Sequence, residues 1–241
     1  MSDDAGGAAS PLYKRHRFPG EISSHAVWLS YRFLLSSRDV EERLAERGIA
    51  VSDETIRQWC QKVGPTFAGR LRRRRPRPGD TWHGDEVQLK SNGRKHWRWR
   101  AVDQDGVVLD ILVPARRTQE AAEAFLRRVV EGNGYRPRVV ITDTLASYPP
   151  ALQRVLPGVE HRRHKGLNNR AEHSHRPTRR RERVLQRFKS PEHAQPFLAP
   201  FGPISDHFRP RRHLLPSPAY HQLLQTRFAT WREITGLQAV A

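Results

Sequence analysis

Hydrophobic and polar positions divide the chain into a helical first part, an alternating middle part and a less regular end. Residues 21–64 carry apolar side chains at helical spacing, in three short segments. Val40, Leu44 and Ile56 are spaced to share one small core. The last two segments are joined by a turn of about four residues, residues 48–51, which predicts a helix-turn-helix.

The middle of the chain alternates between strand and helix patterns. The runs typical of strands are residues 80–90, 95–104, 107–116, 136–143 and 159–164, and those typical of helices are residues 118–134 and 147–158. Three successive strands followed by helix, strand, helix and strand predict an α/β domain with a mixed five-stranded sheet.

The end of the chain is rich in proline. Pro196, Pro200 and Pro203 each predict an interruption of any helix that contains them, and a terminal helix is expected at residues 220–234. The expected segments of the chain are a flexible arm at 1–20, a helix-turn-helix DNA-binding domain at 21–64, a basic linker at 65–80, an α/β domain at 81–190 and a C-terminal helical tail at 191–241.

Charge changes the interpretation of these elements. The formal net charge is +18, with 43 Lys and Arg against 25 Asp and Glu, which indicates a nucleic-acid partner. No apolar run approaches the roughly 18 residues of a membrane-spanning helix. Cys60 is the single cysteine, which excludes an internal disulfide and a cysteine-rich zinc site. With no secretory pattern at residues 1–17, we expect a cytoplasmic protein.

Basic and polar side chains supply candidate DNA contacts. The second helix of the helix-turn-helix is expected in the major groove, where Arg and Gln can read base edges. The alternative is a three-helix bundle that only packs or dimerises. The candidate contacts are Thr55, Arg57, Gln58 and Lys62 on this helix, and Arg72, Arg73, Arg74 and Arg75 in the linker, which is either a solvated spacer or a strap along phosphates.

Three acids stand out against this positive charge. Asp85 lies within the first strand, Asp143 ends the fourth, and Glu172 lies in a basic segment expected to be helical. Carboxylates placed where nucleic acid binds repel phosphate unless they hold a divalent cation. Adjacent first and fourth strands would bring their acids together, and oxygen ligands select magnesium or manganese. Two such ions about 3.5–4 Å apart are suited to phosphodiester chemistry.

Each acid also has a simpler interpretation. Asp85 can be a surface acid with Glu86 as the ligand instead, and Asp143 can cap the next turn. Glu172 can be an exposed helix acid paired with Arg176. The histidines near Glu172 match no familiar zinc spacing, and we expect them to contact phosphate or to pack. These histidines are His161, His164, His173 and His175.

Several longer motifs together resemble one family over nearly the whole chain. They are ETIRQW, RPGDTWHGDE, WRWRAVDQDGVVLDILV, ITDTLASY, HKGLNNRAEHSH, RRRERVLQRFKS and FRPRRH. The chain resembles the bacterial DDE-type insertion-sequence transposases of the IS-six family, which have an RNase-H-like (retroviral integrase) core. The resemblance implies an RNase-H-like DDE catalytic domain at residues 81–190.

The resemblance also implies an activity. Asp85, Asp143 and Glu172 would be the catalytic and metal-binding triad, which favours Asp85 over Glu86. Such enzymes bind the inverted repeats at the ends of the element and cleave there with a metal-activated water. They then join the freed 3′-hydroxyl to target DNA by direct transesterification. A homodimer or larger synaptic complex, associated with the nucleoid, is implied because two ends are cut together.

Other residues follow the family pattern or depart from it. Asn168 and Asn169 match the family's asparagine pair and would shape the site near DNA, while Arg179, Arg181 and Arg183 would track DNA. Where the family usually has lysine directly after the second Asp, this chain has Thr144. That difference, with Pro196 and Pro200, leaves two alternatives: a DNA-binding regulator, or an impaired transposase copy that uses only its helix-turn-helix. A metal nuclease that does not join ends is a third.

Overall fold

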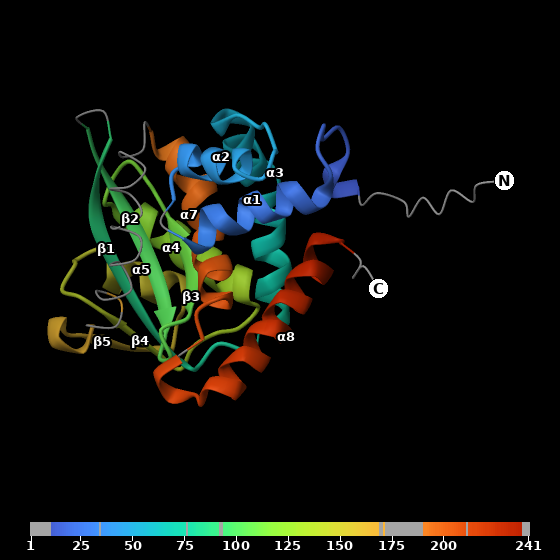
Figure 1. Ribbon diagram of the computed structural model, residues 1–241. Coiled ribbons are helices and arrows are strands. Elements are labelled where there is room, and N and C mark those ends of the chain that lie inside the picture. Colours follow the sequence, from blue (N-terminus) through green and yellow to red (C-terminus); the bar gives the residue numbers. More distant parts are fainter. Residues whose placement is uncertain are drawn as a thin grey trace. The chain divides into compact units, whose positions relative to one another are not determined.

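The structure is a computed structural model with two compact units (Figure 1). It describes residues 11–33, 35–75, 77–91, 94–168, 171, 190–210 and 212–237. One unit, the helical unit, comprises Met1–Arg74 with Pro203–Ala241, and the other, the sheet unit, comprises Arg75–Gly202. None of the described helices is long and apolar enough to cross a membrane.

A mixed five-stranded sheet forms the centre of the sheet unit, as the sequence predicts. Its strands are β1 (Thr81–Ser91), β2 (Arg94–Asp103), β3 (Val108–Leu112), β4 (Val139–Thr142) and β5 (Glu160–Arg163). The spatial order is β3-β2-β1-β4-β5. β2 is antiparallel to β1 and β3, whereas β4 is parallel to β1 and β5. Together with its flanking helices, this arrangement confirms the RNase-H-like fold class.

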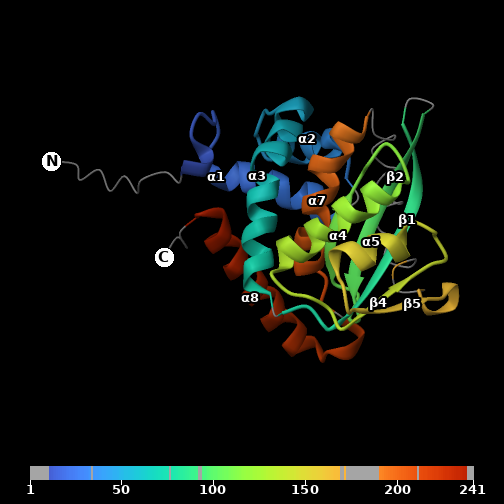
Figure 2. The ribbon, with the colours of Figure 1, turned by 180° about the vertical axis from the view of Figure 1, so that it is seen from behind.

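Two helices cover one face of the sheet, as Figure 2 shows. They are α4 (Gln119–Asn133), whose N-cap is Thr118, and α5 (Tyr148–Val155). Trp82 and Trp99 of the sheet pack in one buried cluster with Phe125 of α4 and Tyr148 of α5. Burial of these large aromatic side chains contributes strongly to the hydrophobic stabilisation of this face.

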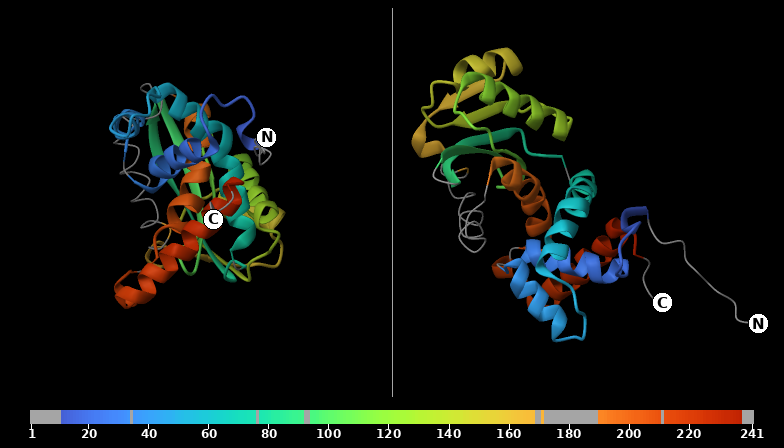
Figure 3. Two further views of the ribbon diagram at one scale, coloured as in Figure 1. Left: turned by 45° about the vertical axis from the view of Figure 1, so that its right-hand side comes forward. Right: turned by 90° about the horizontal axis from the view of Figure 1, so that it is seen from above.

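The opposite face of the sheet carries a second apolar cluster. Leu89, Val102 and Ile111 pack there against Ala194 and Leu198 of α7 (Pro191–His207), together with Ala171. In the right-hand view of Figure 3 the sheet lies between α4 and α5 on one side and the first part of α7, in orange, on the other. The central strands are therefore covered on both faces, whereas the edge strand β5 is mainly exposed.

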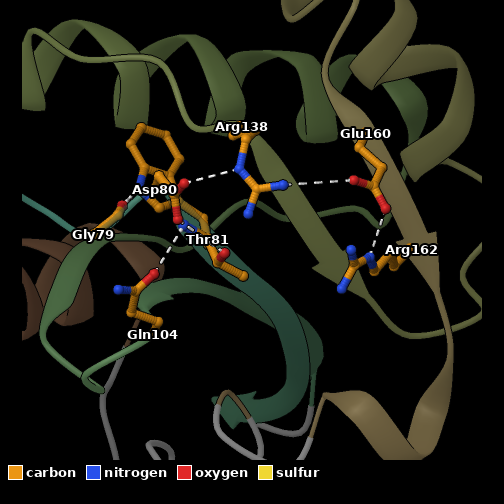
Figure 4. Close-up of polar contacts among 8 residues, drawn as sticks. Gly79, Asp80, Thr81, Gln104, Arg138, Glu160 and Arg162 are labelled. Atoms are coloured by element: carbon orange, nitrogen blue, oxygen red, sulfur yellow. Dashed lines mark hydrogen bonds and ion pairs between the residues drawn. The ribbon is translucent and has the colours of Figure 1, made fainter.

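Charged side chains link the amino ends of the three parallel strands (Figure 4). Arg138 Nε donates to Asp80 at 2.9 Å, and its Nη1 lies 3.9 Å from Glu160. Glu160 in turn accepts a hydrogen bond from Arg162 Nε at 2.6 Å. Their arginine partners lower the pKa of Asp80 and of Glu160. Acids and bases are balanced at this edge.

Helices α1 (Gly20–Arg32), α2 (Ser37–Ala45) and α3 (Asp53–Arg74) build the helical unit, with α8 (Ser217–Thr235). Short 3₁₀ helices lie at η1 (Pro11–Tyr13), η2 (Lys165–Leu167) and η3 (Arg212–Leu214). The helical region predicted near the N-terminus is therefore present. Val40, Leu44 and Ile56 are buried together with Trp59, as the spacing predicts.

Helix α3 continues beyond the predicted end, and this is a correction. The sequence places its end at Gly64 and a linker after it, but the helix runs through Pro65 to Arg74. A Cβ at Gly64 would lie 2.8 Å from the hydroxyl of Tyr31, so the glycine permits a close side-chain contact. Burial of Phe67 and Leu71 extends the apolar stripe and outweighs the roughly 3 kcal/mol cost of an internal proline.

Helix α7 is a second correction. Pro196, Pro200 and Pro203 lie inside it, although each predicts an interruption. Ala194, Leu198, Phe201 and Ile204 recur at helical spacing and are all buried, so tertiary packing overrides the local preference. The family departure inferred from Pro196 and Pro200 therefore carries no loss of helix here. The terminal helix expected at residues 220–234 is part of α8.

Candidate active site

Two of the predicted acids meet where β4 ends beside the middle of β1, because Asp85 lies within β1 and Asp143 directly follows β4. The parallel register pairs Gly84 with Thr142, so the next residues along the chain, Asp85 and Asp143, lie at the same edge. Ligand oxygens of Asp85, Glu86 and Asp143 all lie within 4.8 Å of one another. In open α/β sheets this edge is where ligands bind. Strand topology thus brings two acids, 58 positions apart, into one cluster, as the sequence predicts.

Glu86 is the third member of this carboxylate cluster in the structure. Its side chain is fully buried, and its Oε2 has no hydrogen-bond partner among the described residues. Burial first, and then the neighbouring Asp143, raises the pKa of Glu86 to about 7, against the opposing effect of Arg117. The same acids, after burial itself, raise the pKa of the fully buried Tyr148.

Arg117 is the cation that faces these acids. It lies in the loop between β3 and α4, donates to Glu86 Oε1, and has its Nη2 3.7 Å from Asp143 Oδ2. Its guanidinium carbon lies 4.6 Å from the centre of the Trp97 ring, a cation–π contact that restricts its orientation. Within the described residues, Arg117 pairs with two of the three carboxylates, and the three acids remain crowded together.

Asp143 also has the local role that the sequence left open. Its Oδ1 accepts a hydrogen bond from the Leu145 backbone N–H at 3.0 Å, which fixes the turn after β4. Only one of its oxygens is used in this way, and Oδ2 faces Arg117. Thr142 Oγ1 donates to the Asp143 carbonyl at 3.0 Å and lies 2.9 Å from His161 Nε2. The capping interaction therefore orients the carboxylate of Asp143, which remains part of the cluster.

The predicted residues near the third acid are only partly described. Asn168 is buried, and its side-chain amide donates to the carbonyl of Gly84 at 2.9 Å, directly beside Asp85. Asn168 thus holds the chain against β1. The remaining predicted residues, Glu172, Asn169, Arg179, Arg181 and Arg183, lie outside the described residues, as do His173 and His175.

Among the described residues, the carboxylate cluster includes no histidine. His161 lies against Thr142, and burial followed by the charge of Arg163 lowers its pKa. The metal-capable group found among the described residues consists of carboxylates alone. Carboxylate oxygens are hard ligands, so this donor set fits magnesium or manganese better than zinc.

The residues of α3 that are predicted to contact DNA are solvent-accessible, and they form hydrogen bonds within the protein. Glu54 accepts from Arg57 Nε at 2.8 Å and from Gln58 Nε2 at 3.1 Å. Lys62 donates to the carbonyl of Lys14 at 3.0 Å. Thr55 lies in the first turn of the helix, where its N–H donates to a serine hydroxyl at 3.3 Å. Contact of these residues with DNA stays a prediction.

The four linker arginines occupy different settings. Arg72, Arg73 and Arg74 belong to the last turn of α3, and Arg74 forms an ion pair with Glu233. Arg75 donates to the carbonyl of Val108 at 2.8 Å and to Asn133 Oδ1 at 2.7 Å. The structure therefore corrects the description of Arg72–Arg75 as one uniform spacer or strap.

Sequence reasoning missed two features of the site. Arg117 follows another arginine in a loop, and nothing in the spacing connects it to an acid 31 positions earlier. Glu86 appeared only as an alternative to Asp85, although the structure brings both into one cluster. Period two along β1 predicts opposite faces for two adjacent acids, so the strand pattern gave no signal that both join one cluster.

Comparison with known proteins gives the family. The family model described as "DDE domain" matches residues 79–211. A transposase for insertion sequence-like element IS431mec of Staphylococcus aureus is 31% identical over 68% of this chain and 75% of its own length. The transposase of element IS257 in transposon Tn4003, also from Staphylococcus aureus, is 30% identical over the same shares.

One similar solved structure is the simian T-cell lymphotropic virus intasome in complex with PP2A regulatory subunit B56 gamma. A chain of it aligns with a TM-score of 0.37 and 16% identity, over 70% of this chain and 58% of that one. The domain match and the curated relatives agree with the motifs and with the acidic cluster at the edge of the sheet. The chain belongs to the DDE transposase family of bacterial insertion sequences.

Proposed function

We propose that the protein binds the terminal inverted repeats of an insertion sequence, cleaves the DNA at the element's 3′ ends and joins these ends to target DNA. The observation that carries the proposal is the carboxylate cluster of Asp85, Glu86 and Asp143, within 4.8 Å, in a chain of this family. Its place at the carboxyl edge of the sheet matches where such folds bind ligands.

The donor set of the cluster fits divalent cations. Asp85 and Asp143 would hold magnesium or manganese, and a divalent cation would offset the crowding of carboxylates that raises the pKa of the buried Glu86 beside them. When bound, two such ions supply Lewis acidity at the phosphodiester and lower the pKa of bound water. The protein's own contribution is to hold the acids in place through the Leu145 N–H, Asn168 and Arg117.

Glu172 is proposed as the third member of the catalytic triad. Two described neighbours support this assignment. Ala171, directly before it in the chain, is buried in the same cluster as Leu89 of β1. Asn168 donates to the carbonyl of Gly84, next to Asp85. Both contacts tie this segment to the strand that carries the first acid.

The neutral residue at position 144 is compatible with activity. The carbonyl of Thr144 accepts a hydrogen bond from Arg163. A guanidinium therefore lies beside the position where relatives usually carry lysine, and it can supply the positive charge that Thr144 lacks. This contact favours an active enzyme over an impaired copy.

The proposed partners are the element ends and target DNA, both double-stranded, in the nucleoid. Two ends have to be processed together, so a homodimer or a larger synaptic complex is the proposed assembly. In the helical unit, α2 and α3 with the turn between them supply the proposed helix-turn-helix, with α3 in the major groove.

A strand-joining assay tests the proposal. Full-length protein is incubated with labelled element ends, a target plasmid and magnesium, and joined products are counted. Wild type should join ends, whereas Asp143→Asn and Glu172→Gln should bind the ends and leave them unjoined. If Asp143→Asn joins ends at the wild-type rate, the assignment of Asp143 to the catalytic triad is wrong. Wild type that binds ends and joins none, with either metal, would identify a DNA-binding regulator or an impaired copy.

A further inference from the structure

A cationic hollow lies beside the first turns of α3 in the helical unit. Its volume is about 480 Å³. It is lined from three directions: the segment before α1, the turn before α3, and α3 itself. The lining residues that matter here are Arg15, Arg17, Ser52, Thr55, Gln58 and Lys62. The hollow is separate from the carboxylate cluster, which belongs to the sheet unit.

The segment before α1 is fixed against α3 by aromatic contacts. The ring of His16 stacks on Trp59 with centroids 6.0 Å apart and planes 12° apart. Phe18 meets the same indole edge-on, with centroids 5.6 Å apart. Lys62 Nζ donates to the carbonyl of Lys14 at 3.0 Å. These contacts hold the backbone that carries Arg15 and Arg17 beside the helix.

The backbone at Arg15 shows the same constraint. Its φ is +65°, the one positive value among the described non-glycine residues. For an L-residue this conformation costs about 1 kcal/mol or more, and it persists where the surroundings determine it. The turn at Arg15 reverses the chain between Tyr13, whose hydroxyl donates to the carbonyl of Thr235 at 2.9 Å, and the stacked His16.

The chemistry of the hollow is that of an anion site. Arg15, Arg17 and Lys62 contribute positive charge, and no carboxylate lines the hollow among the described residues. Ser52 and Thr55 add hydroxyl groups, 2.9 Å apart. By contrast, Arg57 on the same helix is paired with Glu54 and lies outside the hollow. A phosphate in the hollow would therefore meet positive charge with no lining carboxylate. A phosphate at Arg57 would instead be repelled by the neighbouring carboxylate of Glu54.

We propose that this hollow is a phosphate subsite that takes one backbone phosphate of the DNA strand beside the groove that α3 enters. Arg15 and Arg17 share that phosphate, with Lys62 and the hydroxyls of Ser52 and Thr55 around it. The inference rests on the proposed role of α3 in DNA binding. It assigns the segment of residues 14–18 to the DNA interface, whereas the sequence suggested only a flexible arm.

Salt dependence of binding tests the subsite. Full-length wild type, Arg15→Gln, Arg17→Gln and the double variant are titrated against a fluorescently labelled duplex by anisotropy, at several salt concentrations. Arg43→Gln, an exposed arginine of α2 outside the hollow, is the matched control. Each phosphate contact contributes about 0.9 to the slope of log K against log salt. Because both arginines share one phosphate, the double variant should lose about 0.9 in slope, and the control none.

Three outcomes would overturn the subsite. A double variant with the wild-type slope and affinity excludes a phosphate contact, and a slope change of about 1.8 shows two separate phosphates. Free inorganic phosphate could also stabilise the wild type, but not the double variant, in a thermal-shift assay. If DNA binding is unchanged in the double variant, that result would identify a site for free anions. Circular dichroism checks that each variant is folded.

The same data separate this inference from the proposed function. If Gln58→Ala alters the preference for the element end while the arginine variants behave as wild type, α3 reads DNA and only the subsite is wrong. If wild type shows no binding to any duplex, both are wrong.

Discussion

Acids and arginines lie both at the amino ends of the parallel strands and beside the carboxyl end of β4, but the pKa values of the acids shift in opposite directions at the two places. At the amino ends, Asp80 and Glu160 are solvent-accessible, contact arginines, and have lowered pKa values. Beside the carboxyl end of β4, burial and Asp143 raise the pKa of Glu86 to about 7 despite Arg117. Balanced, hydrated charges support the fold. Crowded, buried charges of one sign oppose it, and we infer that a divalent cation is what they are arranged to bind.

Exchanging Asp80, directly before β1, and Asp85, within β1, should give the largest contrast. Asp85→Asn removes a proposed metal ligand worth several kcal/mol in the transition state, so strand joining should fall by about 10³-fold or more. The control variant Asp80→Asn, changed five residues earlier in the chain, should join ends at nearly the wild-type rate. Equal losses in both variants would show that the effect comes from the fold of β1.

The pH dependence of stability should have opposite signs at the two ends. The folded-state pKa of Glu86, about 7, lies above its ordinary 4.5. Its contribution to the free energy of unfolding is therefore full below about pH 4.5 and is lost as the pH rises through 7, by roughly 3 kcal/mol. For Asp80 the pKa is lowered, so its contribution is present above pH 3.8 and is lost as the pH falls.

Urea unfolding without divalent cations, between pH 5 and pH 8.5, measures this difference. Wild type should lose more stability across the range than Glu86→Gln, whereas Asp80→Asn should follow the wild-type curve. Parallel curves for wild type and Glu86→Gln would show that the raised pKa of Glu86 is wrong.

Removing the guanidinium of Arg117 should have the next largest effect. Arg117→Ala leaves the buried Glu86 without its ion pair, and we expect a loss of about 2 kcal/mol, because the side chain of Arg117 is one-third exposed. The loss should shrink in the double variant with Glu86→Gln, which no longer buries a charge. Chemical denaturation at pH 8 measures both. Strictly additive losses would contradict a direct coupling between Arg117 and Glu86.

The smallest effect is expected at the amino ends. Arg138→Ala removes contacts with Asp80 and Glu160 in which every side chain is largely solvent-exposed, so the thermal midpoint should change by no more than about 2 °C. Calorimetry measures the midpoint, and joining activity should stay at the wild-type level. A large loss of stability here would mean that the two ends do not differ as described.

Sequence patterns predicted the sheet because its signals are local. Alternation along β1 and β2, and the buried runs at β3 and β4, each identify a strand without reference to any other element. The meeting of Asp85 and Asp143 then followed from strand order alone. The sequence was misleading where local signals conflict with packing: Gly64 and Pro65 suggested a helix end, but Phe67 and Leu71 continue a buried stripe.

The electrostatics of the site was not predictable in the same way. The contact of Arg117 with Glu86 depends on the path of the loop after β3 and on the Trp97 ring that supports the guanidinium. Likewise, the pKa of Glu86 depends on its burial and on the neighbouring Asp143, which are properties of the assembled fold. Residue types at the site were predictable, whereas their charge balance was not.

Manganese binding tests the central claim, that the carboxyl end of the sheet is a divalent-cation site, most directly. Free Mn²⁺ is measured by electron paramagnetic resonance during titration of the full-length protein without DNA. Wild type and the amino-end variant Asp80→Asn/Glu160→Gln should bind Mn²⁺ and release it to excess Mg²⁺, while Asp85→Asn/Asp143→Asn should not bind it. Equal binding by all three proteins would contradict the account.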